Sequence, residues 1–239
     1  MSTYRRHLYF NNKTIKTLIH KWDANPIYLS GNILKDQVNS PYSVDWTAIN
    51  ESTLNLASGY INCSASNFLY TNKFQTDKSF GKYWEISITF KYIKNTTNNN
   101  YVLIDMCSIT GTQPNTAACC IIYKKDVIDT NPKFYYNQAS GDLHYKPVPI
   151  SNMLIENYDN TITIGIEPID NTYAMHYVIV NNKYKFYVTD KFIARDIGNE
   201  VTWNSGTPAY IGRATHPAYY ATNANYFIKD ISMYHLEYF

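Results

Sequence analysis

Apolar and polar residues alternate in short runs along most of the chain, and Asn, Gly, Asp and Pro separate these runs. The clearest run is Tyr83–Ile93, in which the alternate positions are Trp84, Ile86, Ile88, Phe90 and Tyr92. Because successive side chains of a strand point to opposite faces, this pattern predicts a strand that is buried on one face.

Further runs of this kind cover residues 53–57, 60–65, 101–109, 116–123, 161–167, 172–180, 184–188, 209–213 and 226–238. Helical periodicity is confined to residues 153–158 and 191–197, where we expect one or two helical turns. Asn181-Asn182 joins two runs through residues that tolerate positive φ, which predicts a two-residue type I′ hairpin turn. Many short strands with frequent turns predict an all-β fold, an antiparallel β-sandwich.

The N-terminal segment predicts a separate hairpin, in which Asn11-Asn12 joins Tyr4–Phe10 to Lys13–Lys21. An isolated two-stranded hairpin is marginally stable in water, so it is expected to pair with another chain, a symmetry mate or the body of the domain. Residues 23–43 contain Pro and Gly between short apolar groups and are expected to connect the hairpin to that body. The predicted organisation is therefore an N-terminal hairpin and linker, 1–43, followed by one sandwich domain, 44–239.

Charge distinguishes the first residues from the rest of the chain. Residues 1–22 carry Arg5, Arg6, Lys13, Lys16 and Lys21 and no acidic residue, whereas the remainder carries more acidic than basic residues. These bases are too sparse for a nucleic-acid-binding tail, so Arg5, Arg6, Lys13 and Lys16 are expected to dock the protein to an acidic partner.

Two classes of segment are missing from the sequence. No apolar stretch approaches the roughly 20 residues of a membrane-spanning helix, so membrane insertion is not expected. The N-terminus lacks the apolar core and cleavage site of a secretory signal, so synthesis in a cytoplasm is expected.

Catalytic and metal-binding patterns are also missing. The cysteines, Cys63, Cys107, Cys119 and Cys120, show no CxxC spacing and are expected to be reduced and mostly buried, without a metal. The residues most similar to a calcium-binding motif are Asp126, Asp129 and Asn131, but their segment is more typical of a turn. The glutamates are isolated, and no GxSxG, P-loop or GxGxxG motif occurs. We therefore expect no cofactor and no enzymatic activity.

Three segments resemble concanavalin A-like jelly rolls, the fold of laminin G modules and legume lectins. SFGKYWEISITFKY (Ser79–Tyr92) resembles the central strand of that family, and Asn171–Tyr187 resembles a later hairpin. Ala209–Phe239 resembles the closing segment, although Lys229 replaces the usual Gly. The resemblance covers residues 45–239 and implies a concanavalin A-like jelly roll, a fold that the receptor-binding domains of clostridial neurotoxins share.

One segment suits glycan binding, which needs an aromatic face beside hydrogen-bonding side chains. Residues 202–226 combine aromatic residues with Asn, Thr and Gly. The expected site residues are Trp203, Arg213, Tyr219, Tyr220 and Asn225.

These observations favour a non-enzymatic structural or surface-display protein of a bacteriophage virion, such as a head fibre, capsid decoration or tail-associated protein. Its N-terminus would anchor it in a larger assembly as a homo-oligomer, with a trimer the expected state, and its sandwich would bind host surface glycans. The alternatives are a stand-alone bacterial carbohydrate-binding module, which would be extracellular, and a glycoside hydrolase or lyase with an unrecognised site.

Overall fold

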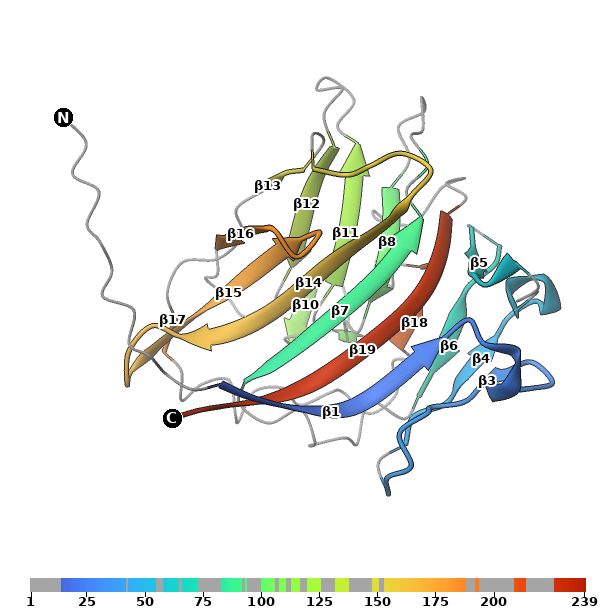
Figure 1. The fold of residues 1–239 in the computed structure, drawn as a ribbon, viewed down its shortest axis with the longest axis horizontal. Helices are drawn as coiled ribbons and strands as arrows, with labels where there is room; N and C mark the ends of the chain where they lie inside the picture. The colour runs from blue at the N-terminus through green and yellow to red at the C-terminus, as the bar shows by residue number, and fades with distance from the viewer. Residues whose placement is uncertain are drawn as a thin grey trace.

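The computed structural model describes residues 14–41, 43–54, 58–64, 66–72, 83–91, 93, 100–105, 108–110, 113–116, 120–125, 132–137, 148–150, 153–187, 192–193, 209–213 and 226–239. Within these ranges the chain forms β-strands and two short 3-10 helices, η1 (Pro26–Tyr28) and η2 (Glu51–Leu54). The strands build two large antiparallel sheets, which confirms the predicted all-β sandwich (Figure 1). Across the same ranges, no helix has the length and apolar character needed to cross a membrane.

The front sheet is the sheet nearest the viewer in Figure 1. Its strand order is β1 (Thr14–Asp23), β19 (Tyr226–Tyr238), β7 (Trp84–Lys91), β14 (Asp159–Pro168), β15 (Tyr173–Val180) and β16 (Tyr184–Tyr187). Two short strands complete it: β17 (Phe192–Ile193) pairs with β15, and β5 (Ile61–Cys63) pairs with β19. The C-terminal strand therefore lies in the middle of the sheet, between the first strand and β7.

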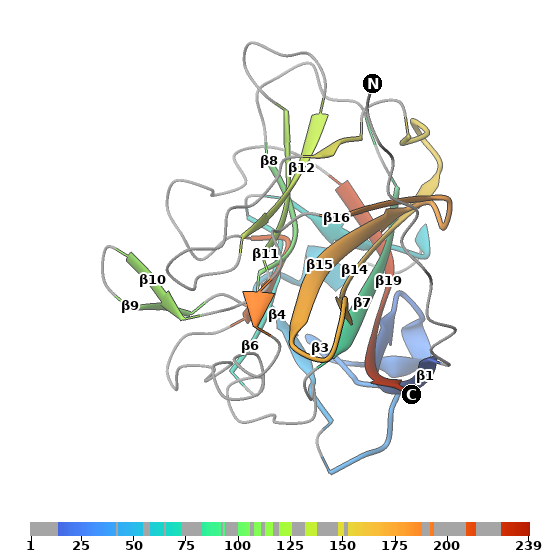
Figure 2. The same cartoon turned by 90° about the vertical axis from the view of Figure 1, so that its left-hand side faces the viewer.

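The back sheet lies behind the front sheet, as the side view in Figure 2 shows. Its strand order is β13 (Val148–Pro149), β12 (Pro132–Asn137), β11 (Cys120–Lys125), β8 (Asn100–Asp105), β18 (Ala209–Ile211), β6 (Leu69–Thr71), β4 (Trp46–Ala48), β3 (Ile33–Leu34) and β2 (Leu29–Ser30). A separate hairpin of β9 (Ser108–Thr110) and β10 (Gln113–Thr116) stands apart from both sheets (Figure 2).

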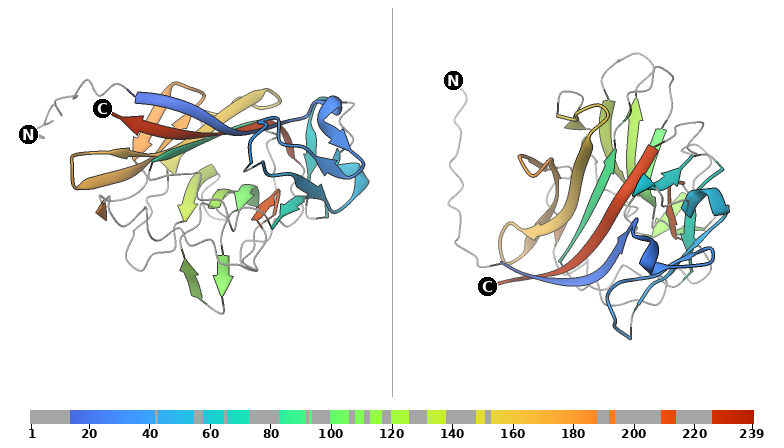
Figure 3. Two further views of the ribbon diagram at one scale, coloured as in Figure 1. Left: turned by 90° about the horizontal axis from the view of Figure 1, so that it is seen from below. Right: turned by 45° about the vertical axis from the view of Figure 1, so that its right-hand side comes forward.

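The hydrophobic core fills the space between the two sheets, which Figure 3 shows as two layers. The front sheet contributes Ile86, Ile88, Phe90, Ile162, Ile164, Val178, Ile231 and Met233, and the back sheet contributes Leu34, Trp46, Leu69, Leu103, Ile104 and Ile211. Full burial of such a side chain stabilises the fold by roughly 1.5–3 kcal/mol. The predicted buried face of Tyr83–Ile93 is confirmed over Trp84–Phe90, because Trp84, Ile86, Ile88 and Phe90 all belong to this core.

The N-terminal strand is part of this sandwich. β1 pairs with β19 from Thr14 opposite Tyr238 to Asp23 opposite Asp230, and β2 and β3 belong to the back sheet. Of the three partners expected for the second arm of the hairpin, the body of the domain is the one observed. The first arm, Tyr4–Phe10, lies outside the described residues.

The predicted turn at Asn181-Asn182 is confirmed. Asn181 and Asn182 have φ angles of 51° and 55°, and the N–H of Lys183 donates to the carbonyl of Val180 at 3.1 Å. Positive φ at both central residues is the type I′ geometry that matches the twist of the flanking strands.

Three local predictions are wrong where the structure describes them. Thr53 and Leu54 were expected to begin a strand but end the 3-10 helix η2. Residues 153–158 form turns rather than a helix, because the Asn160 side chain binds the backbone N–H of Ile155 at 2.7 Å and the carbonyl of Tyr158 at 2.8 Å. Asn157, with a φ of 63°, also interrupts a helical path. In the second expected helical segment, 191–197, the described residues Phe192–Ile193 are a strand.

Candidate functional site

The face of the front sheet that points away from the core carries mainly polar side chains. The strand register places them in rows that cross neighbouring strands. One row runs through Lys21, Ser232, Ser87 and Thr163, and the next runs through Asp23, Asp230, Thr89 and Thr161. Hydrogen bonds join members within the rows, such as Thr163 Oγ1 to Ser87 Oγ at 3.0 Å. This outer face therefore offers hydroxyl, carboxylate and ammonium groups on a rigid sheet.

An open groove of about 720 Å³ lies at the end of this face where β1 leaves the sheet. It is lined by Lys21, Asp23, Ala24, Asn25, Pro26, Gly59, Lys229, Asp230 and Ser232. The walls come from three parts of the sequence that the β1–β19 and β5–β19 pairings bring together. Ala24 and Pro26 supply apolar surface, and the Lys, Asp, Asn and Ser side chains supply hydrogen-bonding groups. We call this feature the groove.

Two carboxylates from neighbouring strands line the groove. Asp23 and Asp230 are directly opposite on β1 and β19, and side chains in such pairs have Cβ atoms about 4.5–5.5 Å apart. Asp230 accepts a hydrogen bond from Thr89 Oγ1 at 3.2 Å, and Lys21 Nζ lies 3.7 Å from a carboxylate oxygen of Asp23. Partial burial raises the pKa of Asp230 above its usual value. Asp230 is therefore a partly desolvated carboxylate that borders open space.

A fixed network forms the next part of the wall. Asp159 accepts hydrogen bonds from Lys229 Nζ at 2.6 Å and from the hydroxyl of Tyr60 at 2.7 Å. Burial acts to raise the pKa of Asp159, but these hydrogen bonds and the nearby Lys229 and Lys91 charges outweigh it, so the pKa is lowered. Lys91 Nζ also lies 4.8 Å from the centre of the Tyr60 ring. The ammonium of Lys229 is thus held by Asp159 at the edge of the groove.

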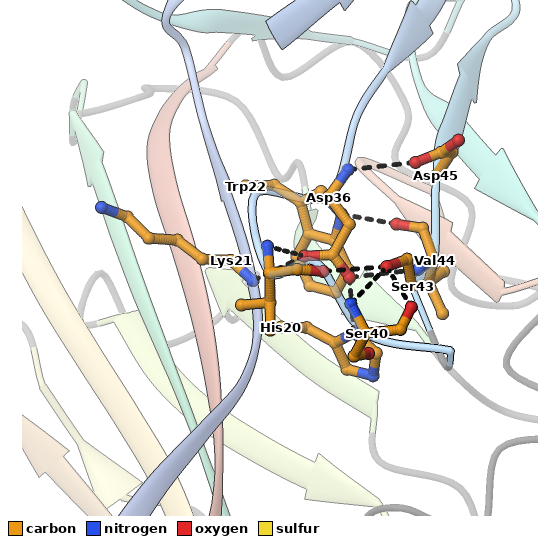
Figure 4. A network of polar contacts seen from close by, with 9 residues as sticks. His20, Lys21, Trp22, Asp36, Ser40, Ser43, Val44 and Asp45 are labelled. Atoms are coloured by element: carbon orange, nitrogen blue, oxygen red, sulfur yellow. Dashed lines mark hydrogen bonds and ion pairs between the residues drawn. The ribbon is translucent and has the colours of Figure 1, made fainter.

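A cluster of buried hydrogen bonds, which we call the clamp, fixes residues 20–22 of β1 next to the groove (Figure 4). Asp36 accepts backbone hydrogen bonds from Lys21, Val38 and Val44 at 3.0–3.1 Å, and one of its oxygens lies 2.6 Å from Nδ1 of the fully buried His20. The indole N–H of Trp22 donates to the carbonyl of Val44 at 2.7 Å. Because the clamp holds the backbone of residues 20–22 in place, it provides a rigid support for the side chain of Lys21 and for that of the adjacent Asp23.

A second polar cluster lies further along the outer face. Glu85 accepts hydrogen bonds from Lys16 Nζ at 2.7 and 2.8 Å and from the Tyr177 hydroxyl at 2.7 Å. Burial, followed by the charge of Glu85, raises the pKa of Tyr177 well above its usual range, so this hydroxyl stays protonated and donates. Glu167 similarly binds Lys185 and the Tyr187 hydroxyl.

Most residues of the predicted glycan site, Trp203, Tyr219, Tyr220 and Asn225, lie outside the described residues. Arg213 follows β18, and its guanidinium lies over the rings of Phe68, at 4.8 Å, and Tyr210, at 5.7 Å. Among the expected docking residues, Arg5, Arg6 and Lys13 also lie outside, whereas Lys16 pairs with Glu85.

The groove residues were not predicted as a site. Asp23 lay in an expected connecting segment, and Asp230 matched only the closing strand of the resembled family. The one signal in the sequence was the placement of charged residues near the end of an expected strand. Their meeting depends on the pairing of the first strand with the last, which no local pattern specifies.

Within the described residues, no group of three or more His, Cys, Asp or Glu side chains is arranged to hold a metal ion. Cys63 is buried.

Comparison with solved structures supports the β-sandwich fold. No protein-family model matches the chain, and no curated protein matches its sequence. The binding domain of botulinum neurotoxin serotype D superposes over 91% of this chain and 47% of its own, with a TM-score of 0.51 and 12% identity. This chain thus spans about half the length of that domain. The expected likeness to the fold of clostridial neurotoxin receptor-binding domains is confirmed.

Two looser similarities involve enzymes. A Trypanosoma rangeli sialidase in complex with 2,3-difluorosialic acid has a TM-score of 0.49 and 13% identity, over 91% of this chain and 30% of its own. A Chlorella virus alginate lyase has a TM-score of 0.42 and 14% identity, over 91% of this chain and 99% of its own.

Proposed function

We propose that this protein is a carbohydrate-binding β-sandwich that holds a glycan in the groove and does not catalyse a reaction. The observation that carries the proposal is the partly desolvated Asp230 carboxylate beside Asp23 in an open groove. Carboxylates accept hydrogen bonds from sugar hydroxyls, and Lys21 and Ser232 can donate to sugar oxygens. Ala24 and Pro26 provide apolar surface for the C–H groups of a sugar ring. The likeness to a toxin binding domain supports a binding role for the sandwich.

Replacement of the Asp230 carboxylate tests the proposal. Asp230→Asn keeps the shape but loses a charged acceptor, and a hydrogen bond to a charged group contributes about 1.5–3 kcal/mol. We therefore expect affinity for the best ligand on a glycan array to fall by roughly tenfold or more, as measured by isothermal titration calorimetry. Glu156→Gln, an exposed change outside the groove, should leave affinity unchanged. Unchanged affinity in Asp230→Asn, or no glycan bound by the intact protein, would refute the proposal.

A glycoside hydrolase is the second candidate, and the same carboxylate pair favours it. Retaining glycosidases use two carboxyl groups about 5–5.5 Å apart, one of which has a raised pKa and acts as the acid. Asp230, with its raised pKa, and the opposite Asp23 suit these roles. Incubation of the protein with its best array ligand, followed by chromatography of the products, separates the two functions. Binding without cleavage supports the first candidate, and cleavage that Asp23→Asn abolishes supports the second.

The narrower prediction, that this is a bacteriophage virion protein, is supported by the basic N-terminal sequence. The structure describes this sequence from Thr14 onward. Detection of the protein in purified particles by mass spectrometry would support it.

A further inference from the structure

β1 forms one outer edge of the front sheet, and β16 forms the other. β1 pairs with β19 on one side only. The second half of its other edge is covered, because Lys21 donates its N–H to Asp36 and accepts a hydrogen bond from Gln37 N–H at 2.9 Å. Within the described part of the chain, the backbone of Thr14–Ile19 has no hydrogen-bond partner on that outer side.

The hydrogen-bond pattern shows which residues face this edge. The N–H of Leu236 donates to the carbonyl of Tyr83, so Leu236 directs its backbone groups toward the β7 side of β19. Backbone groups in antiparallel strands alternate in direction, so Tyr234 points the same way as Leu236. Their partners on β1, Lys16 opposite Leu236 and Leu18 opposite Tyr234, therefore direct their N–H and C=O groups away from the sheet.

We infer that this edge pairs with the same edge of a second copy, which forms a symmetric dimer through one continuous front sheet. In antiparallel pairing about a two-fold axis at Thr17, Lys16 of each copy lies opposite Leu18 of the other. Both residues face the edge, so each of these two pairs exchanges backbone hydrogen bonds. Thr17 then lies opposite Thr17, a favourable cross-strand pair.

The side chains suit a second copy as the occupant. Lys16 meets Leu18 rather than another lysine, and its charge is already compensated by Glu85. Ile15 and Leu18 are 42% and 39% exposed, so they present apolar surface that pairing would cover. Ile15 falls opposite Ile19 of the second copy on the other face of the sheet. Between Thr14 and His20 no like charges oppose each other in this register, and like charges directly opposite would be destabilising.

The symmetry has a consequence for the groove. A two-fold axis that relates two antiparallel edge strands stands perpendicular to the sheet, so both outer faces lie on the same side of the dimer. The two grooves would then face one surface together, and linked sites bind a multivalent surface more tightly than single sites do. The dimer itself does not depend on the proposed glycan binding.

The test is the mass of the full chain in solution, measured by sedimentation velocity over a concentration series. We expect a species of twice 27.7 kDa that dissociates on dilution. Leu18→Lys places a lysine opposite Lys16 of the second copy, twice per dimer, and should weaken the dimer by about tenfold. Leu18→Glu places a carboxylate there instead and should preserve the dimer, with added sensitivity to salt.

Further variants separate edge pairing from loss of folding. Leu18→Pro removes an edge N–H while leaving the β19 hydrogen bonds in place, so it should yield a monomer with an unchanged circular dichroism spectrum. Lys183→Glu, in the β15–β16 turn far from this edge, should leave the mass unchanged. A monomer at every concentration would overturn the inference, whether another segment or another protein covers the edge. A dimer equally stable in Leu18→Lys and Leu18→Glu would also overturn it.

Discussion

His176 shows how burial alone sets the charge of a side chain. It lies in β15, is fully buried and packs at 6.0 Å, edge to face, on Trp84. Burial lowers its pKa to about 3, so the folded protein holds a neutral imidazole over most of the acid range.

The lowered pKa predicts how stability depends on pH. An unfolded chain binds a proton at His176 near pH 6.5 but the folded chain does so only near 3, so protonation favours unfolding in this interval. The contribution of His176 is fully present above pH 6.5 and is lost as pH falls, by about 1.4 kcal/mol for each unit. Urea unfolding should therefore show a smaller pH slope in His176→Leu than in the natural chain.

Val178, which is buried in the same strand, provides the control for this measurement. Val178→Ala should keep the slope of the natural chain between pH 6.5 and 4, because it removes no titratable group. An equal slope in His176→Leu and the natural chain would show that His176 is charged in the folded protein.

At the scale of elements, one glycine allows three strands to share a polar cluster. Gly165 of β14 lies between Tyr177 of β15 and Glu85 of β7. A Cβ atom at this position would lie 2.5 Å from the Tyr177 hydroxyl and 3.0 Å from the Trp84 carbonyl. The missing side chain therefore lets the Tyr177 ring cross β14 and reach Glu85.

Gly165→Ala should destabilise the protein by about 1–3 kcal/mol, because Tyr177 cannot move aside without breaking its hydrogen bond to Glu85. Chemical denaturation measures this cost. In a Tyr177→Leu background most of the penalty should disappear, since the closest contact is gone. A penalty of the same size in both backgrounds would place its cause elsewhere, for example in the strand backbone.

The elements divide into those that sequence patterns could predict and those that they could not. β7 and β19 were predictable because apolar and polar residues alternate along their sequences, and the Asn181-Asn182 turn because its residue type suits positive φ. The turns at 153–158 were not, because hydrogen bonds of the Asn160 side chain decide them, and the short 3-10 helix at Glu51–Leu54 was not predicted either. Glu85 was expected on an exposed face, but Lys16 and Tyr177 cover it.

At the scale of the whole molecule, the pairing of the first strand with the last creates the candidate site. This pairing brings Asp23 to Asp230 and closes the groove with Pro26 and Gly59. The fold class could be predicted from local patterns because the alternation of apolar and polar residues within a strand indicates which of its faces is buried. The site could not, because it consists of residues that are separated by almost the whole chain and meet only through sheet topology.

The central claim, that a glycan occupies the groove, is tested most directly by mapping the bound ligand. We would titrate ¹⁵N-labelled protein with its best oligosaccharide from a glycan array and follow the backbone amide signals by NMR. We expect the amide signals of residues 21–26, 59 and 229–232 to shift together and to saturate with one common affinity. Saturating changes confined to residues 202–225, with the groove signals unmoved, would contradict it.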